Sequence, residues 1–219
     1  ITVPDKTLYH NDGVCTDITV DTENIMDASN ALVFNGVSSV VEVEQSTAYM
    51  PPLDMSITAW VFVPAVMPGS SMTLLNIGDY GTGATRSYRL DIDSNYNLLF
   101  TVSDGSNMYS VGSIEPLKPG WNFIAAVRSV YDSKIILYVN KEGGARKTCV
   151  FTSAPAGGYG TTYAYGQNER STESLIIGAK LSSGTYTNYF KGSVGALTVY
   201  NKVLTAAEVA AIRDDTYTD

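Results

Sequence analysis

Short apolar runs, separated by Gly, Pro, Asn, Asp and Ser, recur about every 8 to 15 residues from Leu32 onward. The runs are rich in Val, Ile, Tyr and Phe, which favour extended chain. We predict strands at 31–34, 39–43, 56–63, 73–77, 86–93, 97–103, 107–113, 121–128, 133–139, 147–151, 174–178 and 193–200. No interval is long and helical enough for a parallel crossover, so the sheets should be antiparallel.

The runs are of two kinds. Residues 41–44, Val-Glu-Val-Glu, and residues 89–93, Arg-Leu-Asp-Ile-Asp, alternate between apolar and charged positions. Such strands bury one face and expose the other. Residues 57–63 and 135–139 are apolar on both faces, which is typical of central strands covered on both sides.

The remaining elements are few. Thr205-Ala-Ala-Glu208 has the pattern of a capping box, which predicts one short helix near the C-terminus. Residues 1–30 are polar, and we expect them to form an N-terminal extension that packs on the domain. We expect Trp60 and Trp121 in the interior shared by two stacked sheets.

Size and charge exclude several classes of function. The chain has 219 residues, 44% of them hydrophobic, which suits one large β domain with a substantial core. The formal net charge is −8 and the basic residues are scattered, so a nucleic-acid partner is not expected. The chain lacks a run of the ~20 apolar residues that spans a bilayer, so membrane insertion is not expected either.

An ordered set of motifs resembles a known superfamily. The matching pieces are Ala31-Leu-Val-Phe-Asn-Gly36 with Val41-Glu-Val43, Ser56-Ile-Thr-Ala-Trp-Val61, Leu98-Leu-Phe-Thr-Val102, Pro119-Gly-Trp-Asn-Phe-Ile-Ala125 with Ile135-Ile-Leu-Tyr-Val-Asn140, Ser174-Leu-Ile-Ile-Gly178, and the segment from Phe190 to Val209. Together they resemble the concanavalin A-like jelly rolls, in the laminin-G-like and pentraxin-like branch. The resemblance covers residues 31–212 and implies an antiparallel jelly-roll β-sandwich in which residues 1–219 form a single domain.

Relatives of this fold include carbohydrate-binding modules, adhesion domains, and glycoside hydrolases and lyases, so function must be argued from sites. Hydrolysis of a glycosidic bond needs two facing carboxylates. The nearest match to the Glu-x-Asp-x-Glu strand of laminarinase-type enzymes is Arg89-x-Asp91-x-Asp93, which begins with the wrong residue. We interpret it as a solvated strand face with a cross-strand or diagonal ion pair. Because His10 is the only histidine and lies in the polar N-terminal segment, nucleophilic triads also fail. We predict that the protein is not an enzyme.

Calcium enters through the resemblance. The family usually carries an acidic pair in its final strand, often near a bound calcium, but Gly195 and Ala196 occupy those positions here. Asp79, which follows Leu75-Asn-Ile-Gly78, is the candidate metal ligand, and a structural calcium ion is the one cofactor considered.

The cysteines leave two alternatives open. Cys15 and Cys149 either form a disulfide or are two buried thiols. We favour the disulfide, because the composition looks extracellular and both cysteines lie among polar residues.

Tyrosines in loops are the most suggestive functional feature among the 15 Tyr. Their rings could pack on the apolar faces of sugars, while neighbouring Asn side chains bind hydroxyl groups. The candidate ligand-binding residues are Tyr80, Tyr159, Tyr163, Tyr165, Asn168, Tyr186, Asn188 and Tyr189. The alternative is that these rings cover the edges of the sandwich.

Two functions follow. The first is a non-catalytic, lectin-like module that binds glycans outside the cell, whether secreted or on a cell or virion surface. The alternative is a structural, adhesion or virion-appendage module whose Tyr-rich loops contact a surface protein. That module would form a homo-oligomer or part of a larger assembly.

Overall fold

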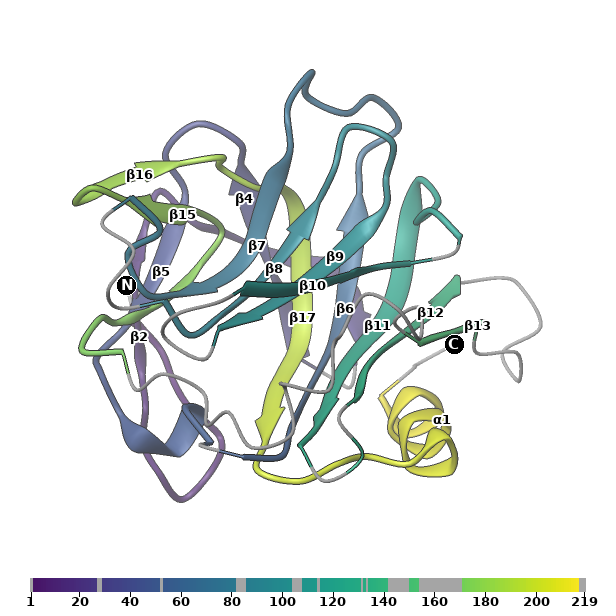
Figure 1. Ribbon diagram of the computed structural model, residues 1–219. Helices are drawn as coiled ribbons and strands as arrows, with labels where there is room; N and C mark the ends of the chain where they lie inside the picture. The colour runs from purple at the N-terminus through teal and green to yellow at the C-terminus, as the bar shows by residue number, and fades with distance from the viewer. Residues whose placement is uncertain are drawn as a thin grey trace.

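Two large antiparallel sheets lie face to face (Figure 1). The computed structural model describes residues 2–26, 29–51, 53–81, 86–103, 108–113, 115–130, 132, 134–141, 150–153 and 171–216. The eight-stranded sheet has the order β1 (Thr2–Val3), β2 (Gly13–Thr16), β5 (Val40–Val43), β14 (Leu175–Ile177), β7 (Met72–Ile77), β8 (Tyr88–Ile92), β9 (Leu98–Ser103), β10 (Met108–Gly112). The seven-stranded sheet has the order β13 (Val150–Ser153), β12 (Lys134–Lys141), β11 (Gly120–Ser129), β6 (Met55–Val63), β17 (Lys191–Tyr200), β4 (Ser29–Asn35), β3 (Thr19–Met26).

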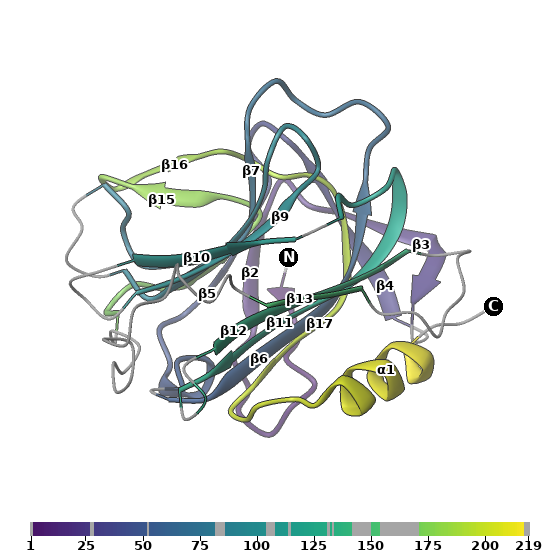
Figure 2. The ribbon, with the colours of Figure 1, turned by 45° about the vertical axis from the view of Figure 1, so that its right-hand side comes forward.

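Three smaller elements complete the fold. The strands β15 (Lys180–Ser182) and β16 (Thr185–Thr187) form a separate hairpin, and η1 (Thr47–Tyr49) is a single 3₁₀ turn. The helix α1 (Ala206–Asp215) lies outside the seven-stranded sheet (Figure 2). The predicted antiparallel jelly-roll class is confirmed.

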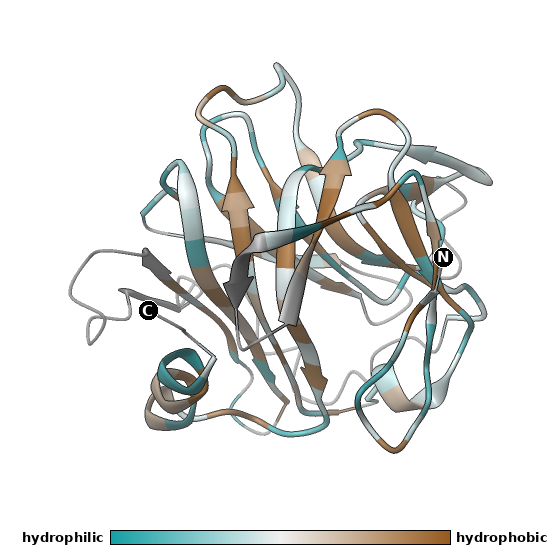
Figure 3. Ribbon diagram, turned by 180° about the vertical axis from the view of Figure 1, so that it is seen from behind, coloured by the Kyte–Doolittle hydropathy of each residue, from teal (hydrophilic) through white to brown (hydrophobic). Residues whose placement is uncertain are grey.

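The main core lies between the two sheets. Leu90 and Phe100 reach it from the eight-stranded sheet, and Ile57 and Ile124 reach it from the other. The hydropathy of the ribbon follows this arrangement, with apolar segments gathered on the strands (Figure 3). The alternation predicted for residues 41–44 is confirmed, because both valines are buried and both glutamates are exposed.

A second apolar cluster corrects the expected position of the two tryptophans. Trp60 and Trp121 are buried, but on the outer face of the seven-stranded sheet and not between the sheets. There Trp60 packs edge-on against Phe123, with 5.4 Å between ring centroids. Because residues 57–63 are apolar on both faces, their pattern did not reveal which face meets the other sheet.

The C-terminal helix covers this second cluster. Its predicted capping box is present: the Thr205 hydroxyl accepts from the Glu208 N–H, and the Glu208 carboxylate accepts from the Thr205 N–H at 2.8 Å. Val209 is fully buried against the sheet, and the Trp60 indole donates to the Thr216 hydroxyl at 2.9 Å. Among the described residues, no helix is long and apolar enough to cross a membrane.

The N-terminal segment contributes strands that the sequence did not predict. Within residues 2–26, β2 pairs with β5 and β3 pairs with β4, so both belong to the large sheets. The apolar signal is weak, because among residues 2–22, whose burial is described, only Gly13 and Ile18 are buried. A Cβ on Gly13 would lie 2.4 Å from the Val41 side chain, so glycine permits the close approach of β2 to β5.

Candidate functional site

A polar row crosses the outer face of the eight-stranded sheet. The register pairs Asn76 of β7 with Arg89 of β8, Arg89 with Thr101 of β9, and Thr101 with Ser110 of β10. The Thr101 and Ser110 hydroxyls are 2.7 Å apart. We call the outward side chains of β7 to β10, together with Tyr80, Arg86 and Ser87, the polar face.

Arg89 and Asp91 form the centre of the polar face. The Arg89 Nε donates to Asp91 Oδ2 at 2.5 Å, and the Thr73 hydroxyl donates to Asp91 Oδ1 at 2.6 Å. An ion pair is present, but it joins two residues of β8 and is not the predicted pair across or diagonally between neighbouring strands. The expectation of a solvated strand face is wrong, because Asp91 is only 5% exposed. Its register opposite Thr73 brings Asp91 a buried hydroxyl that the local sequence does not indicate.

Tyr80 extends the polar face at the end of β7. The Arg89 guanidinium carbon lies 4.3 Å from the centroid of the Tyr80 ring, a cation–π geometry. The Tyr80 N–H donates to the Leu181 carbonyl at 3.0 Å, which fixes the residue against β15. Burial raises the pKa of the Tyr80 hydroxyl, so it stays protonated at neutral pH and can donate.

Several polar atoms of this face are buried without a hydrogen-bond partner in the part of the chain that the structure describes. They are Asn76 Oδ1, Tyr80 Oη, Arg86 Nε and Ser87 Oγ. A buried polar atom left unpaired costs about 1 to 3 kcal/mol. The polar face therefore combines unused donors and acceptors with an aromatic ring.

The β15–β16 hairpin borders the polar face on the side of β7 (Figure 1). Asp79 holds the hairpin in place, because its carboxylate accepts hydrogen bonds from the N–H groups of Gly81, Ser183 and Gly184 at 2.7 to 2.9 Å. A Cβ on Gly81 would lie 2.2 Å from the Ser183 hydroxyl, so the two segments are in close contact. The role of Asp79 as a calcium ligand stays a prediction. Among the described residues, no group of three or more His, Cys, Asp or Glu is placed to hold a metal ion.

The other described candidates lie under or beside the hairpin. Tyr186 and Tyr189 are half-buried against the apolar side chains of Val40 and Ile176. The Tyr186 hydroxyl donates to Glu42 Oε2 at 3.1 Å. Burial, together with the Glu42 charge, raises the pKa of Tyr186 to about 12. These two rings cover the sheet, which is the alternative that we left open, whereas the Tyr80 hydroxyl has no partner.

Asn188 acts through its backbone. It has a φ of 52°, and its carbonyl accepts from the Thr73 N–H at 2.8 Å. This bond joins the end of the hairpin to β7, beside the polar face. The side chains that the sequence reasoning missed are Asn76, Arg86 and Ser87. Extending the alternation of 89–93 backward by two residues would have placed Ser87 on the same face as Arg89.

The remaining predicted residues lie outside the described part of the chain. They are Tyr159, Tyr163, Tyr165, Asn168 and Cys149. Cys15 is half-buried, it forms no disulfide with a described residue, and burial raises the pKa of its thiol. Because the structure does not describe Cys149, the disulfide stays a prediction.

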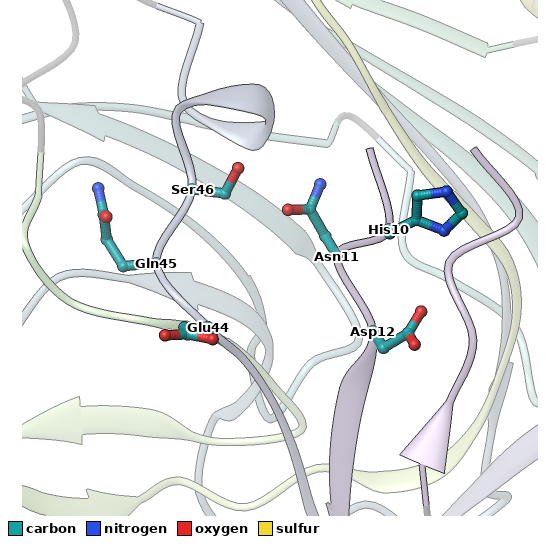
Figure 4. Close-up of a pocket in the computed structure, with 6 residues that line it drawn as sticks. All are labelled: His10, Asn11, Asp12, Glu44, Gln45 and Ser46. Carbon is teal, nitrogen blue, oxygen red and sulfur yellow. The ribbon is translucent and has the colours of Figure 1, made fainter. Parts of the chain in front are cut away.

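A polar cleft of about 310 Å³ opens elsewhere, between the segment before β2 and the segment after β5 (Figure 4). It is lined by His10, Asn11, Asp12, Glu44, Gln45 and Ser46. The Asn11 and Ser46 side chains point toward one another across it, while the His10 ring points away. The six lining residues include no tyrosine or tryptophan, so the cleft offers hydrogen bonds without a platform for a sugar ring.

The carboxylates of Asp91 in β8 and of Asp93 directly after β8 are held by hydrogen bonds within the protein. Asp91 is held by Arg89 and Thr73, and Asp93 Oδ1 accepts from the N–H groups of Asn95 and Asn97 at 2.8 and 2.9 Å. Asp93 thus organises the turn between β8 and β9. The geometry favours recognition of a ligand over acid–base chemistry at these two carboxylates.

Comparison with known families identifies the fold family. The model of a laminin G-type family, described as the concanavalin A-like lectin/glucanases superfamily, matches residues 35–210. The chain belongs to this superfamily. The predicted resemblance is thereby confirmed. Curated protein sequences gave no significant match.

Solved structures show the same fold at low sequence identity. The binding domain of botulinum neurotoxin DC, in complex with rat synaptotagmin II, superposes with a TM-score of 0.65 and 9% identity over 99% of this chain. This chain spans about half of that domain, 51% of its length. The CBM40 of the Ruminococcus gnavus IT-sialidase, bound to α2,3-sialyllactose, gives a TM-score of 0.56 and 16% identity over 80% of this chain and 95% of that one. The heptameric SAP-like pentraxin of Limulus polyphemus superposes with a TM-score of 0.59 and 12% identity, over 84% of this chain and 81% of the pentraxin chain.

Proposed function

We propose that this protein is a non-catalytic, lectin-like module that binds a glycan on the polar face of its eight-stranded sheet. The observation that carries the proposal is the set of unpartnered buried polar atoms beside the Tyr80 ring. Sugars present hydroxyl groups that both donate and accept, next to apolar faces that pack on aromatic rings. The polar face matches both properties.

Three further observations support this proposal. The family is one of lectins and glucanases, and the R. gnavus CBM40 binds a sialylated sugar. Asp91 and Asp93 are held by hydrogen bonds inside the protein, which favours a binding module over a glycosidase. A domain of this kind acts outside the cell, and the extracellular location is part of the proposal.

The test is glycan binding with two matched tyrosine variants. A glycan array would first find ligands, and calorimetry would then compare Tyr80→Ala with Tyr9→Ala. Tyr9 is 67% exposed and directly precedes the residues of the polar cleft. We expect Tyr80→Ala to weaken binding about tenfold, equivalent to ~1.4 kcal/mol, and Tyr9→Ala to leave it unchanged.

If Tyr9→Ala weakened glycan binding and Tyr80→Ala left it unchanged, the glycan site would lie at the polar cleft. A broad array without any bound glycan would reject the proposal altogether. Both variants should first be shown to melt within a few degrees of the wild-type protein, so that a lost fold is not mistaken for a lost contact.

One observation favours a second function, contact with a surface protein: the botulinum neurotoxin binding domain is in complex with rat synaptotagmin II. Under this proposal the loops join a homo-oligomer or a larger assembly. Scattering at high protein concentration tests it, and a strictly monomeric profile would count against it.

A further inference from the structure

Among the residues that the structure describes, Arg86 is a cation without a carboxylate partner. It lies two residues before β8 and is half-buried. Within the described part of the chain, its Nη1 donates to the sulfur of Met108 at 3.2 Å, and its Nε is buried without a hydrogen-bond partner. A thioether is a weak acceptor, and a guanidinium carries five N–H donors in a planar fork. Most of the donor capacity of Arg86 is therefore unused.

The polar face carries more positive than negative charge around Arg86. Among the described residues of this face, two guanidinium groups, Arg86 and Arg89, accompany a single carboxylate, Asp91, which is already bound to Arg89. The nearby Asp79 carboxylate turns toward the β15–β16 hairpin, where three backbone N–H groups satisfy it. The chain as a whole has a net charge of −8, so a positive surface here is a local feature.

The neighbours of Arg86 would complete a site for an anion. Ser87 follows it in the sequence, and its hydroxyl is buried without a hydrogen-bond partner among the described residues. Tyr80 also has an unpartnered hydroxyl, and the positive charge of Arg86 acts on it. A guanidinium and a hydroxyl that act on the same region offer several donors to the oxygens of one anionic group.

We propose that the polar face selects a saccharide carrying one negative charge, with Arg86 binding the anionic group of the ligand and Tyr80 contacting the sugar ring. The inference rests on the proposed function, because it assumes that the polar face binds glycans. Both a carboxylate and a sulfate ester would satisfy Arg86. The planar carboxylate matches the fork of the guanidinium better.

The experiment compares three oligosaccharides with one backbone: neutral, carboxylated and sulfated. Calorimetry would measure each against the wild-type protein, Arg86→Gln and Lys134→Gln. Lys134 is an exposed cation at the start of β12, in the other sheet, so its variant makes the same charge change away from the site. A hydrogen-bonded charge pair corresponds to about a tenfold or larger change in affinity.

We expect the charged ligands to bind wild type and Lys134→Gln about tenfold more tightly than the neutral one. Arg86→Gln should lose this preference and keep the affinity for the neutral ligand. Arg86→Lys keeps the charge but not the fork, so it should weaken carboxylate binding more than sulfate binding.

Two results would overturn the inference alone. They are equal affinities for the neutral and charged ligands, and an equal loss for all three ligands in Arg86→Gln. If none of the three ligands binds and the array contains no bound glycan, the proposed function fails as well. Should Arg86→Gln fail to fold, a salt titration of the wild-type protein tests the inference instead. Only the charged ligands should lose affinity as the ionic strength rises, and an equal salt dependence for the neutral ligand would overturn the inference.

Discussion

The Asp79 carboxylate accepts a hydrogen bond from the Ser183 N–H, 104 residues further along the chain, at 2.7 Å. Its other oxygen accepts from the Gly184 N–H at 2.9 Å. Through these bonds the end of β7 fixes the turn between β15 and β16. Since that hairpin borders the polar face, a single carboxylate couples the shape of the candidate site to the stability of the sheet.

Replacing Asp79 should therefore loosen the hairpin. Asp79→Asn has no charge and one acceptor oxygen instead of two, and we expect it to lower the free energy of unfolding by about 2 kcal/mol. Denaturant unfolding measures this loss, and hydrogen exchange should show reduced protection at residues 180–187. Asp93→Asn is the control, because it removes a comparable set of bonds at the β8–β9 turn. Equal loss of hairpin protection in both variants would contradict the role assigned to Asp79.

Removing the hydroxyl group of Tyr80 and removing that of Tyr186 should change the free energy of unfolding differently. Tyr80→Phe deletes a buried hydroxyl without a partner, so the free energy of unfolding should stay the same or rise by up to about 1 kcal/mol. Tyr186→Phe breaks the bond to Glu42 and should cost about 1 kcal/mol. Chemical denaturation compares the two, while glycan affinity should fall only in Tyr80→Phe. A marked destabilisation by Tyr80→Phe would show that its hydroxyl has a structural partner.

Local patterns were enough to predict most of the sandwich. The alternation at 41–44 identified which side chains of β5 face the core, and the run 56–63 identified β6 as a strand covered on both sides. The capping box at Thr205 predicted the start of α1 at the residue where it begins. These features depend on neighbours in the sequence, so they can be recognised without the fold.

The candidate site depends on contacts between distant segments, and for that reason it was predicted only in part. Tyr80 was named, but the positions of Arg86 and Asp91 follow from the pairing of β8 with its neighbours. The burial of Asp91 depends on Thr73, a residue 18 positions away. Trp60 was placed on the wrong face, because a strand that is apolar on both sides fits equally well in either orientation.

The packing of α1 on the outer face of the seven-stranded sheet can be tested with a matched pair of valines. Val209 belongs to α1 and is fully buried against the sheet, whereas Val66 is 80% exposed. We expect Val209→Ala to lower the free energy of unfolding by about 2 kcal/mol, because it leaves a cavity against the sheet. Val66→Ala should change it by less than about 0.5 kcal/mol. Denaturant unfolding measures both, and a similar small effect of the two substitutions would mean that the helix adds little to stability.

The start of the same helix should respond to pH. Lys202 Nζ donates to Glu208 Oε1 at 2.7 Å, and this bond, aided by Thr205, lowers the pKa of Glu208 from 4.5 to about 2. Because the folded pKa is depressed, the stabilisation is present above pH 4.5 and is lost as the pH falls through about 2. Wild type should thus melt at a higher temperature than Glu208→Gln near neutral pH, and the difference should shrink across that acidic range. Lys202→Met should reduce the same pH dependence, whereas Lys134→Met, which removes an exposed cation from another strand, should preserve it. A melting difference between wild type and Glu208→Gln that stays constant from neutral pH to pH 2 would show that the ion pair does not contribute.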